Sequence, residues 1–97
     1  MELRVTAEGR SGRTSDRAAS DKSVLGITEP GQYWAVDAKV ENANSDQLRK
    51  GAIARFWGTE HGAEADAAAI RRGERLYKGT GLRYVDPVVT RAHAYWR

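Results

Sequence analysis

Apolar and polar side chains alternate over residues 1–8, which predicts a short strand with one apolar face. A second alternation, YWAVDAKVE, predicts a strand over Gln32–Val40 that turns Trp34 and both valines to one side. The apolar stretch Val24–Thr28 lies just before it, and Pro-Gly, a pair typical of tight turns, separates the two. We therefore expect Val24–Thr28 and Gln32–Val40 to pair as a β-hairpin.

Residues 9–23, GRSGRTSDRAASDKS, contain few apolar side chains and cannot contribute much to a core. This composition predicts a long mobile loop. A second interpretation is a basic arm that lies along phosphates, because the stretch contains Arg10, Arg13, Arg17 and Lys22.

Residues 48–57, LRKGAIARFW, fit both the periodicity of a strand and that of a helix. As a strand, they direct Phe56 to one side and Arg55 and Trp57 to the other. As a helix capped by Ser45, they form an apolar stripe. The preceding turn cluster NANSDQ favours the strand, as does a glycine inside the stretch, which weakens a helix by about 1 kcal/mol.

The main predicted helix spans Ala63–Lys78 and ends at Gly79. One of its faces carries small or apolar side chains at helical spacing, namely Ala65, Ala69, Gly73 and Leu76. Such a face allows a neighbouring surface to come close, and protein interiors are densely packed. We therefore expect the rings of Trp34 and Phe56 to pack against it.

These elements predict one α+β domain over residues 1–97. It consists of a small antiparallel β-sheet of about three to five strands packed against one main α-helix at about 63–78. The last segment begins as a strand over Leu82–Val85 and breaks at an Asp-Pro pair. Residues 88–97 fit a strand or a short helix, and the pattern favours neither.

The composition narrows the possible functions. The chain has 97 residues, no cysteine and a net charge of +3 from 16 basic and 13 acidic side chains. The lack of cysteine excludes disulfides, zinc–thiolate sites and cysteine nucleophiles, and it makes the cytoplasm the expected compartment. Because no apolar run of about 18 residues is present, we expect no membrane partner. The mild basic excess permits nucleic-acid binding without requiring it.

Catalytic chemistry has little support in the sequence. Glu60, His61 and His93 could perform acid–base work or bind a metal. However, Glu60 and His61 fall in a turn before a helix, where both are ordinary polar residues. The glycines of YKGTG follow a helix, whereas a phosphate-binding loop precedes one. We expect no catalytic residue, no metal site and no cofactor, and we predict that the chain is not an enzyme.

A basic cluster is expected at the end of the predicted helix, formed by Arg71, Arg72, Arg75 and Lys78. One interpretation is that these charges complement the helix dipole and aid solubility. The other is a patch that binds an anionic partner. Farther along, tyrosines and tryptophans are interspersed with arginines, a mixture that suits nucleic acid and protein interfaces alike.

Two stretches within Val24–Gly79, WAVDAK at residues 34–39 and RFWGTEHGAEADAAAIRRGERLYKG at residues 55–79, resemble the AP2/ERF-like DNA-binding domain. That domain also occurs in mobile-element integrases and homing endonucleases. The resemblance implies a three-stranded sheet, backed by one helix, that lies in the DNA major groove. The chain departs from the family because VLGITE, the counterpart of its arginine-rich first strand, contains no basic residue.

Matched residue by residue, the resemblance implies that Asp37, Lys39, Arg55 and Trp57 face the DNA. Periodicity independently places Asp37 and Lys39 on one face, and Arg55 and Trp57 on one face. We therefore expect a non-enzymatic DNA-binding accessory protein of a phage or mobile element, which uses these residues together with the basic cluster. The competing expectation is a protein-binding inhibitor or adaptor, such as a phage protein that blocks a host defence complex.

Overall fold

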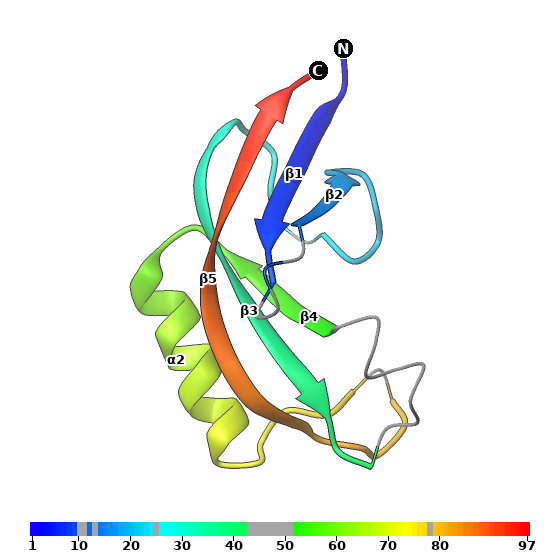
Figure 1. Cartoon of the computed structure of the whole chain (residues 1–97), viewed down its shortest axis with the longest axis vertical. Coiled ribbons are helices and arrows are strands. Elements are labelled where there is room, and N and C mark those ends of the chain that lie inside the picture. The colour runs from blue at the N-terminus through cyan, green and yellow to red at the C-terminus, as the bar shows by residue number, and fades with distance from the viewer. Residues whose placement is uncertain (10–11, 13, 25, 43–51, 78) are drawn as a thin grey trace.

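The C-terminal strand β5 (Tyr84–Trp96) is the centre of the sheet (Figure 1). The computed structural model describes residues 1–9, 12, 14–24, 26–42, 52–77 and 79–97. The other elements are β1 (Leu3–Glu8), β2 (Thr14–Ala18), β3 (Gly31–Val40), β4 (Ala52–Trp57) and α2 (Glu60–Arg71). All strand pairs are antiparallel, in the order β2-β1-β5-β3-β4. This confirms the predicted α+β fold, in which an antiparallel sheet packs against one helix.

The two alternating stretches form strands as predicted, and they become β1 and β3. The preferred strand at the end of 48–57 is also confirmed, because residues 52–57 form β4. Residues 48–51 of that prediction lie outside the described residues. The open choice for 88–97 is settled in favour of a strand, since β5 extends to Trp96 and pairs with β1 and β3.

The prediction of a mobile loop over residues 9–23 is wrong for its central part, which forms β2. This strand pairs with β1 from Ala18 opposite Arg4 to Thr14 opposite Glu8. It lies at the edge of the sheet and is held by polar contacts. For example, the Nε–H of Arg4 donates a hydrogen bond to Oδ1 of Asp16 at 2.9 Å. Periodicity detects strands that have an apolar face, and β2 has none.

The predicted hairpin between Val24–Thr28 and β3 is also wrong. Apart from Leu25, which lies outside the described residues, this stretch has no strand structure, and β3 pairs instead with β4 and β5. Val24 and Ile27 of this stretch are nevertheless buried, because they pack onto the sheet. The stretch therefore covers the sheet instead of extending it.

The helix begins earlier and ends earlier than the predicted 63–78. At its start, the Thr59 hydroxyl accepts a hydrogen bond from the N–H of Gly62 at 3.1 Å, which caps α2. At its end, Gly73 adopts a φ of 75° and donates its N–H to the carbonyl of Ile70 at 2.9 Å. The N–H of Glu74 donates to the carbonyl of Ala69 at 3.1 Å. This pair of bonds is a Schellman motif, so the helix ends before Gly73 and not at the expected Gly79.

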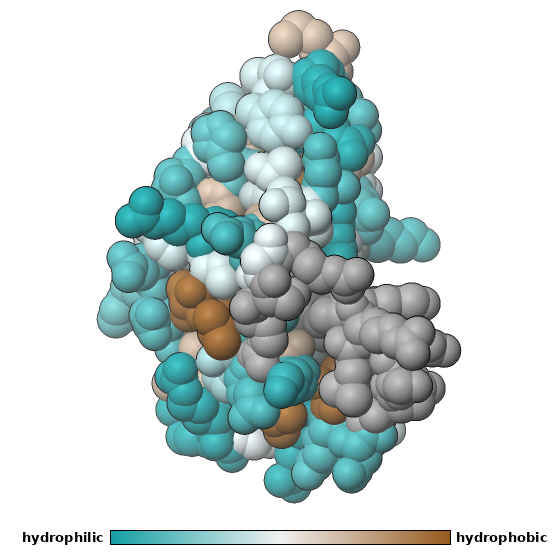
Figure 2. All heavy atoms as spheres, in the orientation of Figure 1, coloured by the Kyte–Doolittle hydropathy of each residue, from teal (hydrophilic) through white to brown (hydrophobic). Residues whose placement is uncertain are grey.

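The sheet has two faces, each with its own core. On the helix face, the buried residues are Val36, Ala38, Val40 and Tyr84, with Ala63, Ala67 and Ile70 of α2. On the far face, the buried residues are Leu3, Val5, Ala7, Ala35, Phe56, Ala92 and Ala94, with Val24 and Ile27 of the segment between β2 and β3. In Figure 2, strongly hydrophobic atoms appear only as separate spots in the lower half of the view.

The expected pairing of rings with the helix is half correct. Trp34 packs on the helix face as predicted, but Phe56 lies in the far-face core and is 4% exposed. Its neighbour Trp57 packs on the helix face instead. Adjacent residues of a strand face opposite sides, so only one of these two rings can meet the helix.

The predicted inner stripe of the helix is rotated relative to the observed one. The buried residues of α2 are Ala63, Asp66, Ala67 and Ile70, whereas Ala65 is exposed. This set has the i, i+3, i+4, i+7 spacing of an inner face. It includes Asp66, which is buried because Trp57 and Arg75 both donate hydrogen bonds to its carboxylate.

Candidate nucleic-acid interface

The structure separates the residues that the sequence places on one recognition face. Asp37 and Lys39 alternate with Val36 and Ala38 of the helix face, so they lie on the far face. Asp37 is only 5% exposed and therefore offers no contact surface. Lys39 is half exposed, and its Nζ lies 4.0 Å from the carboxylate of Asp86.

Arg55 and Trp57, by contrast, belong to the helix face. Trp57 donates its indole N–H to Oδ2 of Asp66 at 3.1 Å, and the guanidinium of Arg55 lies 4.3 Å from the Trp57 ring centroid. The ring is thus half-buried between the helix and a cation. The expected face of Asp37, Lys39, Arg55 and Trp57 does not exist. Arg55 and Trp57 stand opposite Val36 and Trp34 on the helix face, whereas Asp37 and Lys39 lie on the far face.

The basic cluster at the helix end is divided as well. Arg72 forms an ion pair with Glu74 at 3.0 Å, and Arg75 forms one with Asp66 at 2.8 Å. Lys78 lies outside the described residues. Within the described part of the chain, Arg71 is the one member of the cluster without an ion pair. Arg72 and Arg75 are thus held in ion pairs with carboxylates of this chain.

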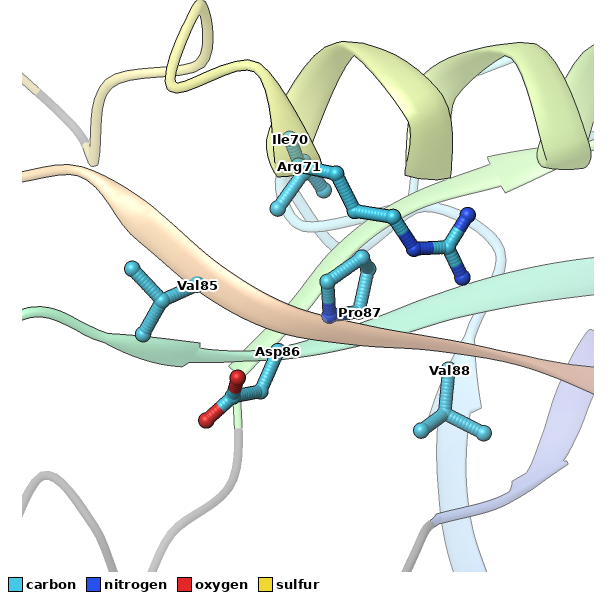
Figure 3. A pocket seen from close by; sticks show the side chains of 6 residues that line it. All are labelled: Ile70, Arg71, Val85, Asp86, Pro87 and Val88. Atoms are coloured by element: carbon cyan, nitrogen blue, oxygen red, sulfur yellow. The ribbon is translucent and has the colours of Figure 1, made fainter.

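Arg71 borders an open groove of about 600 Å³ between the end of α2 and β5 (Figure 3). Its lining is mainly apolar and consists of Ile70, Val85, Pro87 and Val88, with Arg71 and Asp86 as its charged members. In Figure 3, the guanidinium of Arg71 and the carboxylate of Asp86 lie on opposite sides of the β5 ribbon. Two opposite charges on an apolar floor do not form a basic surface for an anionic chain.

Another part of the helix face is left uncovered by α2. In Figure 1, the helix lies beside the lower, orange half of β5, and no helix lies beside the upper, red half. Val89 packs on the helix face, so alternation places Arg91, His93 and Tyr95 on the same side. Ala92 and Ala94, between them, belong to the far-face core. We call the uncovered area the open face and define it as Arg4, Thr6, Gln32, Arg91, His93 and Tyr95.

The register of the sheet assembles the open face from distant parts of the chain. Thr6 of β1 and Gln32 of β3 stand opposite His93 on its two sides. Arg4 stands opposite Tyr95, and Trp34 stands opposite Arg91. These side chains are exposed or half-buried. The sheet therefore presents a row of polar, basic and aromatic groups on rigid paired backbone.

His93 and Tyr95 form a stacked pair of rings, which we call the ring pair. Their centroids are 5.9 Å apart and their planes differ by 11°. The Tyr95 hydroxyl donates a hydrogen bond to Oδ2 of Asp16 at 3.1 Å, which fixes the ring from β2. Parallel rings held this way can continue the stack with a further flat group.

Most of the charge near the ring pair is already compensated. Asp16 accepts a hydrogen bond from Arg4 and lies 3.9 Å from the guanidinium of Arg97. Arg4 also pairs with Glu2 at 3.2 Å. We call Glu2, Arg4, Asp16 and Arg97 the Asp16 cluster, and its formal charges cancel. Arg91 is exposed and forms no ion pair within the described part of the chain.

The Asp16 cluster has a consequence for stability in acid. Hydrogen bonding from Arg4 lowers the pKa of Asp16 below its usual value, partial burial opposes this shift, and the Tyr95 hydroxyl adds to it. Because the folded-state pKa lies below the unfolded-state value of about 4, the cluster stabilises the fold above that pH. The contribution is lost as the pH falls through the folded-state pKa.

We therefore expect Asp16→Asn to make the free energy of unfolding less dependent on pH between about 5 and 2, measured by urea unfolding across that range. Asp86→Asn is the matched control, because this carboxylate is 70% exposed and lies 4.0 Å from its partner Lys39. The same pH dependence in the Asp16→Asn variant and in the unchanged protein would contradict the role of the cluster.

The sequence shows the mixture of aromatics and arginines near the C-terminus but not the open face that they form with β1 and β3. The alternation of Arg91, His93 and Tyr95 is a usable signal once 88–97 is assigned to a strand.

The three residues considered for acid–base chemistry do not form one site, since Glu60 and His61 begin α2 whereas His93 lies on β5. Among the described residues, no three His, Cys, Asp or Glu side chains gather where they could hold a metal ion. No helix in the described ranges is both long and apolar enough to cross a membrane.

The chain was compared with protein-family models, with curated proteins and with solved structures, and no match was found. The side chains of the open face and the sheet that holds them are therefore the basis for inferring a function.

Proposed function

We propose that the chain is a non-enzymatic nucleic-acid-binding protein that binds single-stranded DNA across the open face. The observation that carries the proposal is the ring pair, in which His93 is exposed and Tyr95 half-buried, with Arg91 on one side along the sheet and Arg4 on the other. A role as an accessory protein of a phage or mobile element stays a prediction.

The ring pair supplies a surface for unpaired bases. Stacking of a base on an aromatic side chain contributes about 1–3 kcal/mol and tolerates any base, because every base has a flat π face. His93 is exposed, and Tyr95 is fixed by its hydrogen bond to Asp16. A ring that is already fixed loses little conformational entropy when a base stacks on it.

The arginines supply contacts for the backbone that connects such bases. Arg91 precedes His93 by two residues on the same face, so its guanidinium is placed to reach a phosphate beside a stacked base. Arg4 and Arg97 lie at the other end of the ring pair. Residues 91–95 span about 13 Å of strand, so we expect a binding site at the short end of the range of about 4–16 nucleotides typical of small single-strand-binding folds.

The width of the open face favours a single strand over a duplex. Its groups and Asp16 come from β2, β1, β5 and β3, four strands at a spacing of about 4.8 Å, so the outer strand axes lie about 14 Å apart. The major groove of B-DNA is about 12 Å wide and admits a helix or a two-stranded ribbon. Bases in a duplex are stacked on each other and cannot also stack on the ring pair.

The competing function is binding to a protein partner. A specific observation favours it, because Trp96 is 51% exposed and Leu76 is 56% exposed. Tyrosine, tryptophan and arginine dominate protein interfaces as well. The two functions differ in their dependence on salt and in the effect of ring substitutions.

The role of the ring pair can be tested by measuring DNA affinity with fluorescence anisotropy. The probe is a labelled DNA strand of about 12 nucleotides, which is longer than the site, used alone and as part of a duplex. We expect the single strand to bind at least about tenfold more tightly than the duplex. His93→Ala should weaken single-strand binding about 5- to 150-fold. Tyr95→Phe, which keeps the ring but loses the hydroxyl that fixes it, should weaken binding less than His93→Ala does.

The charge contribution has a matched pair of variants. Arg91→Gln and Arg71→Gln each remove one exposed arginine, but only Arg91 lies on the open face. We expect Arg91→Gln to reduce the salt slope of log K by about 0.7, the value for one phosphate of a single strand, and Arg71→Gln to leave it unchanged. Equal reductions of the salt slope in both variants would indicate that the DNA is attracted by the net charge of the protein alone.

Two other outcomes have clear meanings. Equal binding of single strand and duplex would contradict the single-strand part of the proposal and leave DNA binding in place. If neither DNA binds at low salt while a pull-down retains one protein that His93→Ala does not release, the open face is not a nucleic-acid site and the competing function is supported.

A further inference from the structure

We infer that Asp16 acts on the open face as an internal competitor of the DNA phosphates, holding Arg4 and Arg97 until a phosphate takes the place of its carboxylate. The inference rests on the proposed function and concerns its regulation. Asp16 comes from the edge strand β2, whereas the one ring and the two arginines that it contacts come from β5, β1 and the residue that follows β5.

The contacts of Asp16 are those that a bound phosphate would make. Its Oδ1 accepts from the Nε–H of Arg4 at 2.9 Å, its Oδ2 accepts from the hydroxyl of Tyr95 at 3.1 Å, and the guanidinium of Arg97 lies 3.9 Å from Oδ2. Arginine pairs with carboxylates and phosphates through the same donor fork. A phosphate oxygen and this carboxylate therefore compete for the same arginine donors.

The exposure of the cluster permits the exchange. The side chain of Asp16 is 34% exposed, that of Arg4 is 25% exposed and that of Arg97 is 74% exposed. Water and salt screen an ion pair of this kind, so breaking it has a small free-energy cost. Arg97 has the longest contact and the greatest exposure, and we expect it to be released first.

The charge balance gives Asp16 its effect on affinity. With Asp16 in place, the Asp16 cluster has no net formal charge, and Arg91 is left as the uncompensated cation of the open face within the described residues. Without the Asp16 carboxylate, the cluster gains one positive charge beside the ring pair. Each additional phosphate contact to a single strand steepens the salt slope of log K by about 0.7.

The test is to compare Asp16→Asn with the unchanged protein in binding to the same labelled single strand at several salt concentrations. Asparagine keeps an oxygen that can accept from the Tyr95 hydroxyl, so the ring pair stays fixed. We expect Asp16→Asn to bind about 5- to 30-fold more tightly at low salt, with the salt slope steeper by about 0.7–1.4 for one or two additional phosphate contacts.

The matched control is Glu74→Gln, which also removes one carboxylate from an exposed arginine pair, that of Arg72, but away from the open face. It should change the affinity less than about twofold. Equal tightening by both variants, or weaker binding by Asp16→Asn, would overturn the inference and leave the proposed function standing. If neither the unchanged protein nor Asp16→Asn binds the strand while thermal melting shows both folded, both proposals fail.

Discussion

Replacing Arg75 with methionine is expected to lower the free energy of unfolding by about 3–5 kcal/mol, a large part of the roughly 5–15 kcal/mol typical of a domain. The Asp66 side chain is 3% exposed, and it accepts from Arg75 at 2.8 Å and from the indole N–H of Trp57 at 3.1 Å. Methionine keeps the aliphatic stem but leaves a buried carboxylate with one neutral donor. Since Arg75 is 28% exposed, we expect a value in the lower half of the range. Urea unfolding measures it.

Two further variants separate the buried charge from the loss of a surface arginine. Arg72→Met breaks the exposed pair with Glu74 and should leave the melting temperature almost unchanged. The double variant Asp66→Leu, Arg75→Met removes both charges and should recover much of the loss, because an apolar pair can replace a buried ion pair. Recovery will be incomplete, since Trp57 loses its acceptor. A single Arg75→Met variant as stable as the unchanged protein would contradict the role of this contact.

This contact also explains why the helix was only partly predictable from the sequence. Ala63, Ala67 and Ile70 follow the period of an inner face, but the fourth member is Asp66, and a charged residue argues against burial in any reading of hydrophobicity. Its two donors are nine residues away on either side along the chain. No local pattern shows that they meet, so the apolar alternative with Ala65 and Ala69 was favoured.

The strands, like the helix, were predictable from the sequence only in part. β1 and β3 have one apolar face and were predictable from alternation. β2 has none, and it exists because β1 offers it a paired edge and because Arg4 reaches Asp16. For β4, alternation separates Phe56 from Trp57 but cannot assign which ring faces the helix. The indole N–H decides, because on the helix face it finds the Asp66 carboxylate.

The candidate site was the least predictable part. The sequence shows Arg91, His93 and Tyr95 at alternating positions, but it does not show that Arg4 and Asp16 lie beside them. Those neighbours are set by the register of β5 against β1 and of β1 against β2, which joins the two ends of the chain. The uncovered state of this face depends in turn on where α2 begins, because the helix starts just after Trp57, is capped by Thr59, and runs from there toward Val85–Val88, away from the open face.

Phe56→Ala is expected to lower the free energy of unfolding by about 3–5 kcal/mol, the range for deleting a buried aromatic side chain. Phe56 is 4% exposed and lies in a core that is rich in alanine, including Ala35 and Ala94. Alanine has no side-chain rotamers with which to fill a cavity, so the surroundings can collapse little and the upper half of the range is expected. Phe56→Leu, which keeps much of the volume, should cost about 1–1.5 kcal/mol. Urea unfolding measures both variants.

The Phe56→Leu variant also tests the faces of the sheet by NMR. We expect its methyl shifts to change at Val5 and Ile27 of the far-face core and to stay constant at Ala67 of α2. Ala35 stands opposite both Phe56 on β4 and Thr90 on β5, so these three side chains face the same side of the sheet. A shift at Ala67 without one at Val5 would place Phe56 against the helix. Such a slip of β4 would also turn Arg55 and Trp57 to the far face, because a change of one residue in register moves every side chain of the slipped strand to the other side.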